Sequence, residues 1–203
     1  MNRVIFFIDG FNLYHALDEK VQYRKYKWLK LYKLCNCYVR KIDNIENIYY
    51  FTALVTWDQN KVNRHKLYIK VLEHSGIKVI YGAFKQKEKC CRECGKKYKS
   101  YEEKQTDINI ATQLLVMAFQ DKYDTAIIIS GDTDLIPAIR AVKTVFSVKK
   151  IGIVLPIGRS SEHLKQVADC YYKMNEQQIK SSIFDYEIDI GNNQKLSCPN
   201  NWR

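Results

Sequence analysis

Short runs of apolar residues recur along the chain at intervals that suit buried strands. Three of them, at residues 4–8, 126–129 and 151–155, are nearly continuous instead of alternating with polar residues. Such runs are typical of strands that are covered on both faces, as in a parallel sheet. Further strands are predicted at residues 45–54 and 77–83, with a possible last strand at residues 170–173.

Segments with helical periodicity lie between these strands, which predicts a doubly wound α/β fold. The expected helices cover residues 28–41, 58–75, 106–120, 134–145 and 160–168. Two regions break the alternation. Residues 85–101 form a charged, cysteine-bearing insertion, and residues 185–203 form a polar tail that we expect to be loosely held. We therefore expect one domain over residues 1–175 and a C-terminal extension over residues 176–203.

Charge is the strongest compositional signal. The chain has 203 residues with 33 Lys and Arg against 22 Asp and Glu, a formal net charge of +11. Between Lys20 and Lys41 there are eight basic residues and no acid, with five aromatic residues among them. Basic side chains neutralise phosphates and aromatic rings stack on bases, so this pattern favours a nucleic-acid partner. The same pattern would also suit a solvated helix face whose tyrosines pack on the core.

Acidic residues follow two of the buried strands directly. Asp9 ends the first strand, and Asp132 and Asp134 come just after residues 126–129. Asp107 opens a helix on its apolar side and should point inward. Ligands of open α/β sheets bind beyond the carboxyl ends of the strands, so these four acids could converge there.

Four carboxylates in a partly buried site repel one another unless a cation is present, and hard oxygen ligands suit Mg²⁺ or Mn²⁺. The alternative is ordinary helix capping. Asp134 could cap a helix that begins at Leu135, and Asp107 could simply favour a helix dipole. The four acids taken together favour a metal site over this alternative.

Three segments resemble the motifs of NYN domains, which are relatives of PIN-domain nucleases, and more narrowly those of the LabA-like branch. The segments read Phe7-Ile8-Asp9-Gly10-Phe11-Asn12, Glu103-Lys104-Gln105-Thr106-Asp107 and Ser130-Gly131-Asp132-Thr133-Asp134-Leu135-Ile136-Pro137. The resemblance covers about residues 1–175, with the motifs in the expected order. One departure is Gln105-Thr106, where many members carry a small residue.

The resemblance implies a PIN-like three-layer fold and a metal-dependent ribonuclease. It assigns the metal, Mg²⁺ or Mn²⁺, to Asp9, Asp107, Asp132 and Asp134. Asn12 would orient the first acid or a phosphate, and two hydroxyl groups, those of Ser130 and Thr133, would support the acids or contact phosphate. Lys104 could balance phosphate charge, although a solvated lysine is the alternative. The rival to catalysis is a non-catalytic RNA-binding or scaffold protein that keeps the fold.

The insertion contains a C-x-x-C pair, Cys91 and Cys94, followed by glycine, which is one half of a structural zinc site. The missing ligands could come from Cys35 and Cys37, from Cys198, or from a second chain in a homodimer. An unmetallated turn and a redox-sensitive dithiol are the alternatives. Seven cysteines without a secretion signal, and no apolar stretch long enough for a membrane, lead us to expect a cytoplasmic protein. The resemblance implies RNA, single-stranded or structured, as its partner.

Overall fold

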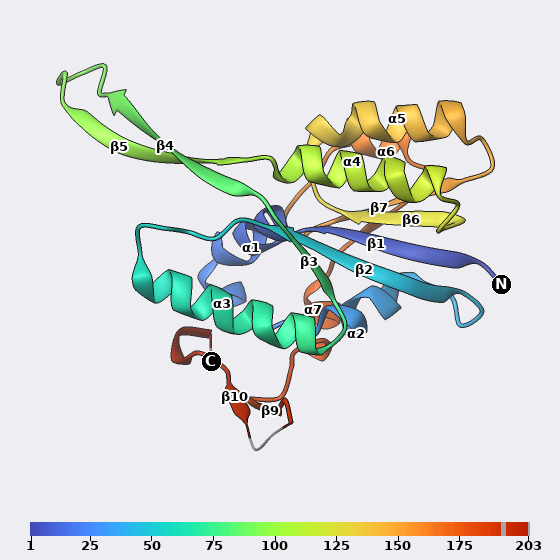
Figure 1. Ribbon diagram of the computed structural model, residues 1–203, viewed down its shortest axis with the longest axis horizontal. Helices are drawn as coiled ribbons and strands as arrows, with labels where there is room; N and C mark the ends of the chain where they lie inside the picture. The colour runs from blue at the N-terminus through green and yellow to red at the C-terminus, as the bar shows by residue number, and fades with distance from the viewer. Residues whose placement is uncertain (192–193, 203) are drawn as a thin grey trace.

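The central feature of the computed structural model is a sheet of six parallel strands, with the order β3-β2-β1-β6-β7-β8 (Figure 1). The structure describes residues 1–191 and 194–202. The strands are β1 (Arg3–Asp9), β2 (Asn44–Thr52), β3 (Lys78–Tyr81), β6 (Thr125–Ile129), β7 (Lys150–Leu155) and β8 (Cys170–Lys173). Phe6 and Phe7 point to opposite faces of β1 and both are fully buried, so the continuous apolar run marks a strand covered on both sides.

Helices cover both faces of this sheet and complete three layers (Figure 1). One face carries α1 (Gly10–Asp18), α2 (Leu31–Cys35), α3 (Gln59–His74) and α7 (Glu176–Ser181), and the other carries α4 (Thr106–Phe119), α5 (Ile136–Val145) and α6 (Glu162–Val167). The expected α/β fold with a central parallel sheet is confirmed. Within the described ranges no helix is both long and apolar enough to span a bilayer.

One helix prediction needs correction, and two helices, α1 and α7, were not predicted. The helix expected over residues 28–41 is only α2 followed by a 3₁₀ turn at Asn36–Tyr38. Trp28 instead lies in a bend next to Leu29, which forms an isolated antiparallel bridge with Ile183. The indole N–H of Trp28 donates to the carbonyl of Asp185 at 3.0 Å, and its backbone carbonyl accepts from Phe184. This long-range pairing overrides local helical periodicity. Conversely, α1 follows β1 without a break and was not expected.

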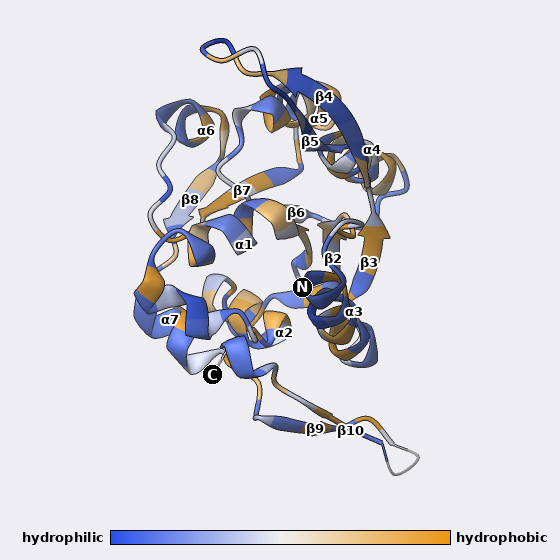
Figure 2. Ribbon diagram, turned by 90° about the vertical axis from the view of Figure 1, so that its left-hand side faces the viewer, coloured by the Kyte–Doolittle hydropathy of each residue, from blue (hydrophilic) through white to orange (hydrophobic). Residues whose placement is uncertain are grey.

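The charged insertion is a long β-hairpin of β4 (Ala83–Cys90) and β5 (Lys97–Lys104), which projects away from the sheet (Figure 1). Figure 2 shows that its outer part is mostly hydrophilic. Its two strands pair with each other from Ala83↔Lys104 to Cys90↔Lys97, so the hairpin supplies its own backbone hydrogen bonds. The hairpin can therefore project into solvent with few buried apolar side chains.

The C-terminal extension is packed on the domain, contrary to the loose tail that we expected. It contains a small hairpin of β9 (Glu187–Asp189) and β10 (Lys195–Ser197), and its described part reaches a buried Trp202, 7% exposed. The Trp202 ring lies 5.9 Å from that of Tyr68 and 6.3 Å from that of Trp28. The aromatic contacts hold the described part of this extension against α3.

Candidate active site at the carboxyl end of the sheet

The first and third acidic motifs meet because β1 and β6 are neighbouring parallel strands. Asp9 ends β1 and caps α1, where its carboxylate accepts from the backbone N–H of Asn12 at 2.9 Å. Asp132 caps the 3₁₀ turn after β6, where it accepts from the N–H of Asp134 at 2.9 Å. The capping alternative for Asp134 is wrong, because Leu135 is the N-cap residue of α5 and no side chain makes a capping bond there. Asp107 lies in the first turn of α4.

Hydrogen bonds tie these two strand ends together. The Ser130 hydroxyl donates to Oδ2 of Asp9 at 2.9 Å and accepts from the backbone N–H of Asp132 at 3.0 Å. Oδ1 of Asn12 accepts from the N–H of Gly131 at 3.1 Å. Asn12 and Ser130 thus fix the positions of the acids on either side. Thr133 is exposed beside them.

The acids lie close enough to perturb one another. Burial raises the pKa of Asp9 from 3.8 to about 6, and the charges of Asp107 and Asp132 add to the rise. Its hydrogen bonds from Asn12 and Ser130 act in the opposite direction. The pKa of Asp107 is also raised, first by burial and then by Asp132 and Asp134. All four acids therefore belong to one electrostatic cluster.

The cluster has the donor chemistry for a divalent cation but is not arranged as a finished coordination shell. Among residues 1–191 and 194–202, no group of three or more His, Cys, Asp or Glu side chains is gathered closely enough to hold a metal. None of the ion pairs among the same residues involves any of the four acids, although the chain is strongly cationic. Mg²⁺ keeps several waters and needs only one or two direct carboxylates, so the donor set suits such an ion.

Glu103 is a further acid of this site that the sequence did not single out. It is the last residue but one of β5, and burial raises its pKa from 4.5 to about 7, with added contributions from the charges of Asp9 and Asp107. The Thr106 hydroxyl donates to its Oε1. The available signal was its position within the second motif, one residue before Lys104. Lys104 itself pairs with Glu102 at 3.4 Å and is half exposed, as the alternative of a solvated lysine expects.

The family model described as the NYN domain matches residues 3–175. The chain belongs to this NYN domain family. NYN domains are generally nucleases, so membership indicates a nuclease-like role. The LabA-like branch stays a prediction.

Two individual proteins resemble this NYN domain. The 6-hydroxy-3-succinoylpyridine 3-monooxygenase HspA of Pseudomonas putida is 25% identical over 189 residues, which cover 76% of this chain. The chain spans only 59% of the length of that enzyme. A crystal structure of a protein of unknown function, VPA0982 from Vibrio parahaemolyticus, superposes with a TM-score of 0.61 at 15% identity, over 86% of this chain and 94% of that one. The likeness to VPA0982 supports the fold alone.

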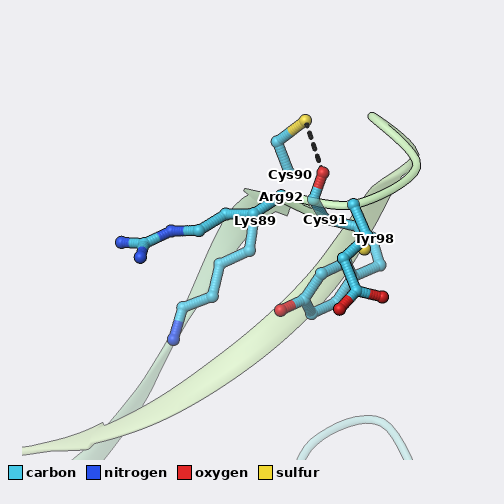
Figure 3. Close-up of a pocket in the computed structure, with 6 residues that line it drawn as sticks. Lys89, Cys90, Cys91, Arg92 and Tyr98 are labelled. Carbon is cyan, nitrogen blue, oxygen red and sulfur yellow. Dashed lines mark hydrogen bonds between the residues drawn. The ribbon is translucent and has the colours of Figure 1, made fainter.

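The cysteine pair of this NYN domain lies at the tip of the β4–β5 hairpin. Backbone N–H groups of Cys94 and Glu93 hold the pKa of the Cys91 thiol below its usual value, as in a turn that presents a thiolate to a metal. Figure 3 shows the thiol of the neighbouring Cys90 pointing away from that of Cys91.

Cys35 and Cys198 cannot complete a zinc site at this tip, because both are buried in the core on the α2 side of the sheet. Cys37 is exposed on the same part of the molecule. Figure 1 shows the hairpin tip projecting well away from that region. Zinc at Cys91 and Cys94 stays a prediction, and its remaining ligands would have to come from a second chain.

Proposed function

We propose that this NYN domain is a divalent-metal-dependent endoribonuclease that hydrolyses phosphodiester bonds in RNA. The observation that carries the proposal is the cluster of four aspartates at the carboxyl ends of β1 and β6. Burial and the charges of neighbouring aspartates raise the pKa of Asp9 and of Asp107, and none of the four acids has a basic partner among the described residues. A protein with a net charge of +11 that keeps its main acidic cluster unpaired is suited to binding a cation and a polyanion together.

Each residue of the cluster has a role in this proposal. Asp9, Asp107, Asp132 and Asp134 would hold Mg²⁺ or Mn²⁺. When bound, the metal lowers the pKa of a water and offsets charge on the scissile phosphate. Ser130 keeps the Asp9 carboxylate oriented towards the Asp132 turn, because its hydroxyl bonds to both.

Asn12 accepts a hydrogen bond from the backbone N–H of Gly131 and so holds the third motif against the first. This bond would keep the spacing of the two strand ends when a phosphate group binds. Thr133 is exposed beside the acids, where its hydroxyl can reach phosphate. Six thiols are free, those of Cys35, Cys37, Cys90, Cys91, Cys94 and Cys170. Free thiols suit the reducing cytoplasm, which we propose as the location of the protein.

The test is cleavage of labelled single-stranded and structured RNA by purified protein in Mg²⁺, Mn²⁺ or EDTA, beside Asp132→Asn. Asparagine also caps helices well, so this variant should fold while it loses one charge. We expect metal-dependent cleavage that falls at least about 100-fold in Asp132→Asn, with RNA affinity unchanged or higher. Asp58→Asn is the matched control, because Asp58 caps α3 in the same way outside the cluster.

Undiminished cleavage by Asp132→Asn would show that the metal site is wrongly assigned. RNA binding without cleavage by the wild-type protein would favour the alternative function, an RNA-binding or scaffold protein that retains the nuclease fold.

A further inference from the structure

A cavity of about 600 Å³ is lined by residues of α1, of α3 and of the β4–β5 hairpin. Its floor is apolar and includes Leu29, Tyr68 and Trp202. Its lining adjoins the acidic cluster, because two of its lining residues, Gly10 and Phe11, directly follow Asp9. Such a volume and lining are typical of a site for a small organic group.

The mouth of this cavity is lined by aromatic rings from three separate parts of the chain. Trp57, from the loop after β2, stacks on Tyr101 of β5 with ring centroids 3.7 Å apart, and it meets Phe84 of β4 edge-on at 5.0 Å. Phe11 of α1 contacts Phe84 in turn at 5.8 Å. Trp57 nevertheless remains 42% exposed. A large aromatic ring left exposed at a cavity mouth is a platform on which a base can stack.

Basic side chains line the same cavity on the α3 side. Lys61 and Arg64 are one helical turn apart and therefore lie on one face of α3. Arg64 is only partly exposed, yet its guanidinium makes no hydrogen bond or ion pair with any residue in the described ranges. By contrast, two other basic residues of the lining, the buried Lys27 and the exposed Arg24, are both paired with Asp18. Arg64 is thus a cation available for an anionic group of a ligand.

The interior also offers neutral hydrogen-bonding groups. Nε2 of His65 lies 3.0 Å from the hydroxyl of Thr52, and both residues line the cavity. Burial lowers the pKa of His65 from 6.5 to about 4, so the imidazole is uncharged at neutral pH. A neutral imidazole can donate from one nitrogen and accept at the other, which suits the polar edge of a base.

We propose that this cavity binds one unstacked nucleotide of single-stranded RNA, with the base against Trp57 and the phosphate on Arg64, beside the acids that cut the strand. The inference rests on the proposed ribonuclease function and names its substrate class, single-stranded RNA. Aromatic stacking, an unpaired cation and continuity with Asp9 together fit a nucleotide, whereas a base within a duplex is not free to enter a cavity.

The test measures binding in EDTA, so that cleavage does not contribute. The probe is a fluorescein-labelled single-stranded RNA of mixed sequence, compared with the same strand in a duplex. We expect single-stranded RNA to bind more tightly than duplex. Trp57→Ala should weaken the binding of the single strand about 5- to 100-fold, and Arg64→Gln about tenfold. A strand with 2-aminopurine scanned along it should show a fluorescence change at one position, and Trp57→Ala should abolish that change.

Two matched controls separate the cavity from general charge and aromatic effects. Lys66→Gln removes an exposed charge of α3 outside the cavity, and Tyr98→Ala removes an exposed ring of the same hairpin. Both should bind RNA within about twofold of wild type. Wild-type affinity in Trp57→Ala, equal affinity for single strand and duplex, or displacement of the RNA by an aromatic carboxylate but not by UMP or AMP would overturn the proposal.

The outcomes also distinguish the two proposals. Metal-dependent cleavage that Trp57→Ala leaves unchanged would refute the cavity and keep the nuclease. A Trp57-dependent fluorescence change without cleavage by the wild-type protein would keep the cavity and refute the nuclease.

Discussion

Replacing Asp9 with Asn should stabilise the metal-free protein while it removes activity. The pKa of Asp9 rises from 3.8 to about 6 in the fold, a difference of about two units, and one unit corresponds to about 1.4 kcal/mol. Because the folded-state pKa is the higher one, Asp9 lowers stability as pH rises from 3.8 through 6, by about 3 kcal/mol in all. Asn carries no charge, but it weakens the hydrogen bond from Ser130, which offsets about 1 kcal/mol. The net gain should be about 2 kcal/mol above pH 7.

The assay is urea denaturation followed by circular dichroism, in EDTA and with Mg²⁺ or Mn²⁺. In EDTA at about pH 7.5, Asp9→Asn should be more stable than wild type, and the difference should vanish near pH 4. Added metal should stabilise wild type and not the variant, because only the native wild-type site binds it. Asp58→Asn, which changes an exposed cap of the same kind, should stay within about 0.5 kcal/mol. Lower stability of Asp9→Asn in EDTA would refute the reasoning, since it would make Asp9 an ordinary stabilising cap.

Two further predictions concern stability. Burial holds the pKa of His65 at about 4 against 6.5, so folding should lose up to about 3 kcal/mol as pH falls from 6.5 through 4. Asp9 and Glu103, whose pKa values are raised, change stability in the opposite direction over this pH range. The contribution of His65 is therefore measured as the difference in the free energy of unfolding between wild type and His65→Gln, from urea denaturation at each pH. The same pH dependence of that free energy in both proteins would contradict the prediction. Trp202→Ala should cost about 3–5 kcal/mol in the same assay because its ring is buried against Trp28 and Tyr68. A loss below about 1 kcal/mol would show that the extension is not part of the core.

The sheet could be predicted because its strands are buried on both faces and so carry uninterrupted apolar runs. The helix α1 escaped prediction since it begins at Gly10, a poor helix former. The structure gives the reason for the glycine: a Cβ there would lie 2.4 Å from Cζ of Tyr50 and 2.7 Å from the carbonyl oxygen of Phe51. Close packing against β2 therefore requires glycine at position 10, although glycine has a low helix propensity. The helix prediction at Trp28 was wrong for the opposite reason, because its hydrogen bonds to the distant residues Asp185 and Phe184 hold this segment in a non-helical conformation.

The acids of the site were visible in the sequence because each follows a strand or opens a helix. The aromatic cavity was not, because Trp57, Arg64 and Tyr101 come together only through the β2–α3 loop, α3 and the hairpin. The sequence spacing of these three residues does not indicate that they lie close together in the fold. Glu103 belongs to the second motif, but its charged neighbours, Asp9 and Asp107, come close to it only in the folded chain.

The contact between Ser130 and Asp9 joins residues 121 positions apart in the sequence, and it has a consequence for the order of folding. The charge cluster exists only once β6 has paired with β1, whereas the β4–β5 hairpin forms from neighbouring residues alone. Long-range parallel pairing is slow compared with such local contacts. Repulsion among the aspartates therefore arises late, after most of the chain is in place. Interactions absent from the transition state change the rate of unfolding more than that of folding, so the repulsion shortens the lifetime of the metal-free native state without slowing its formation.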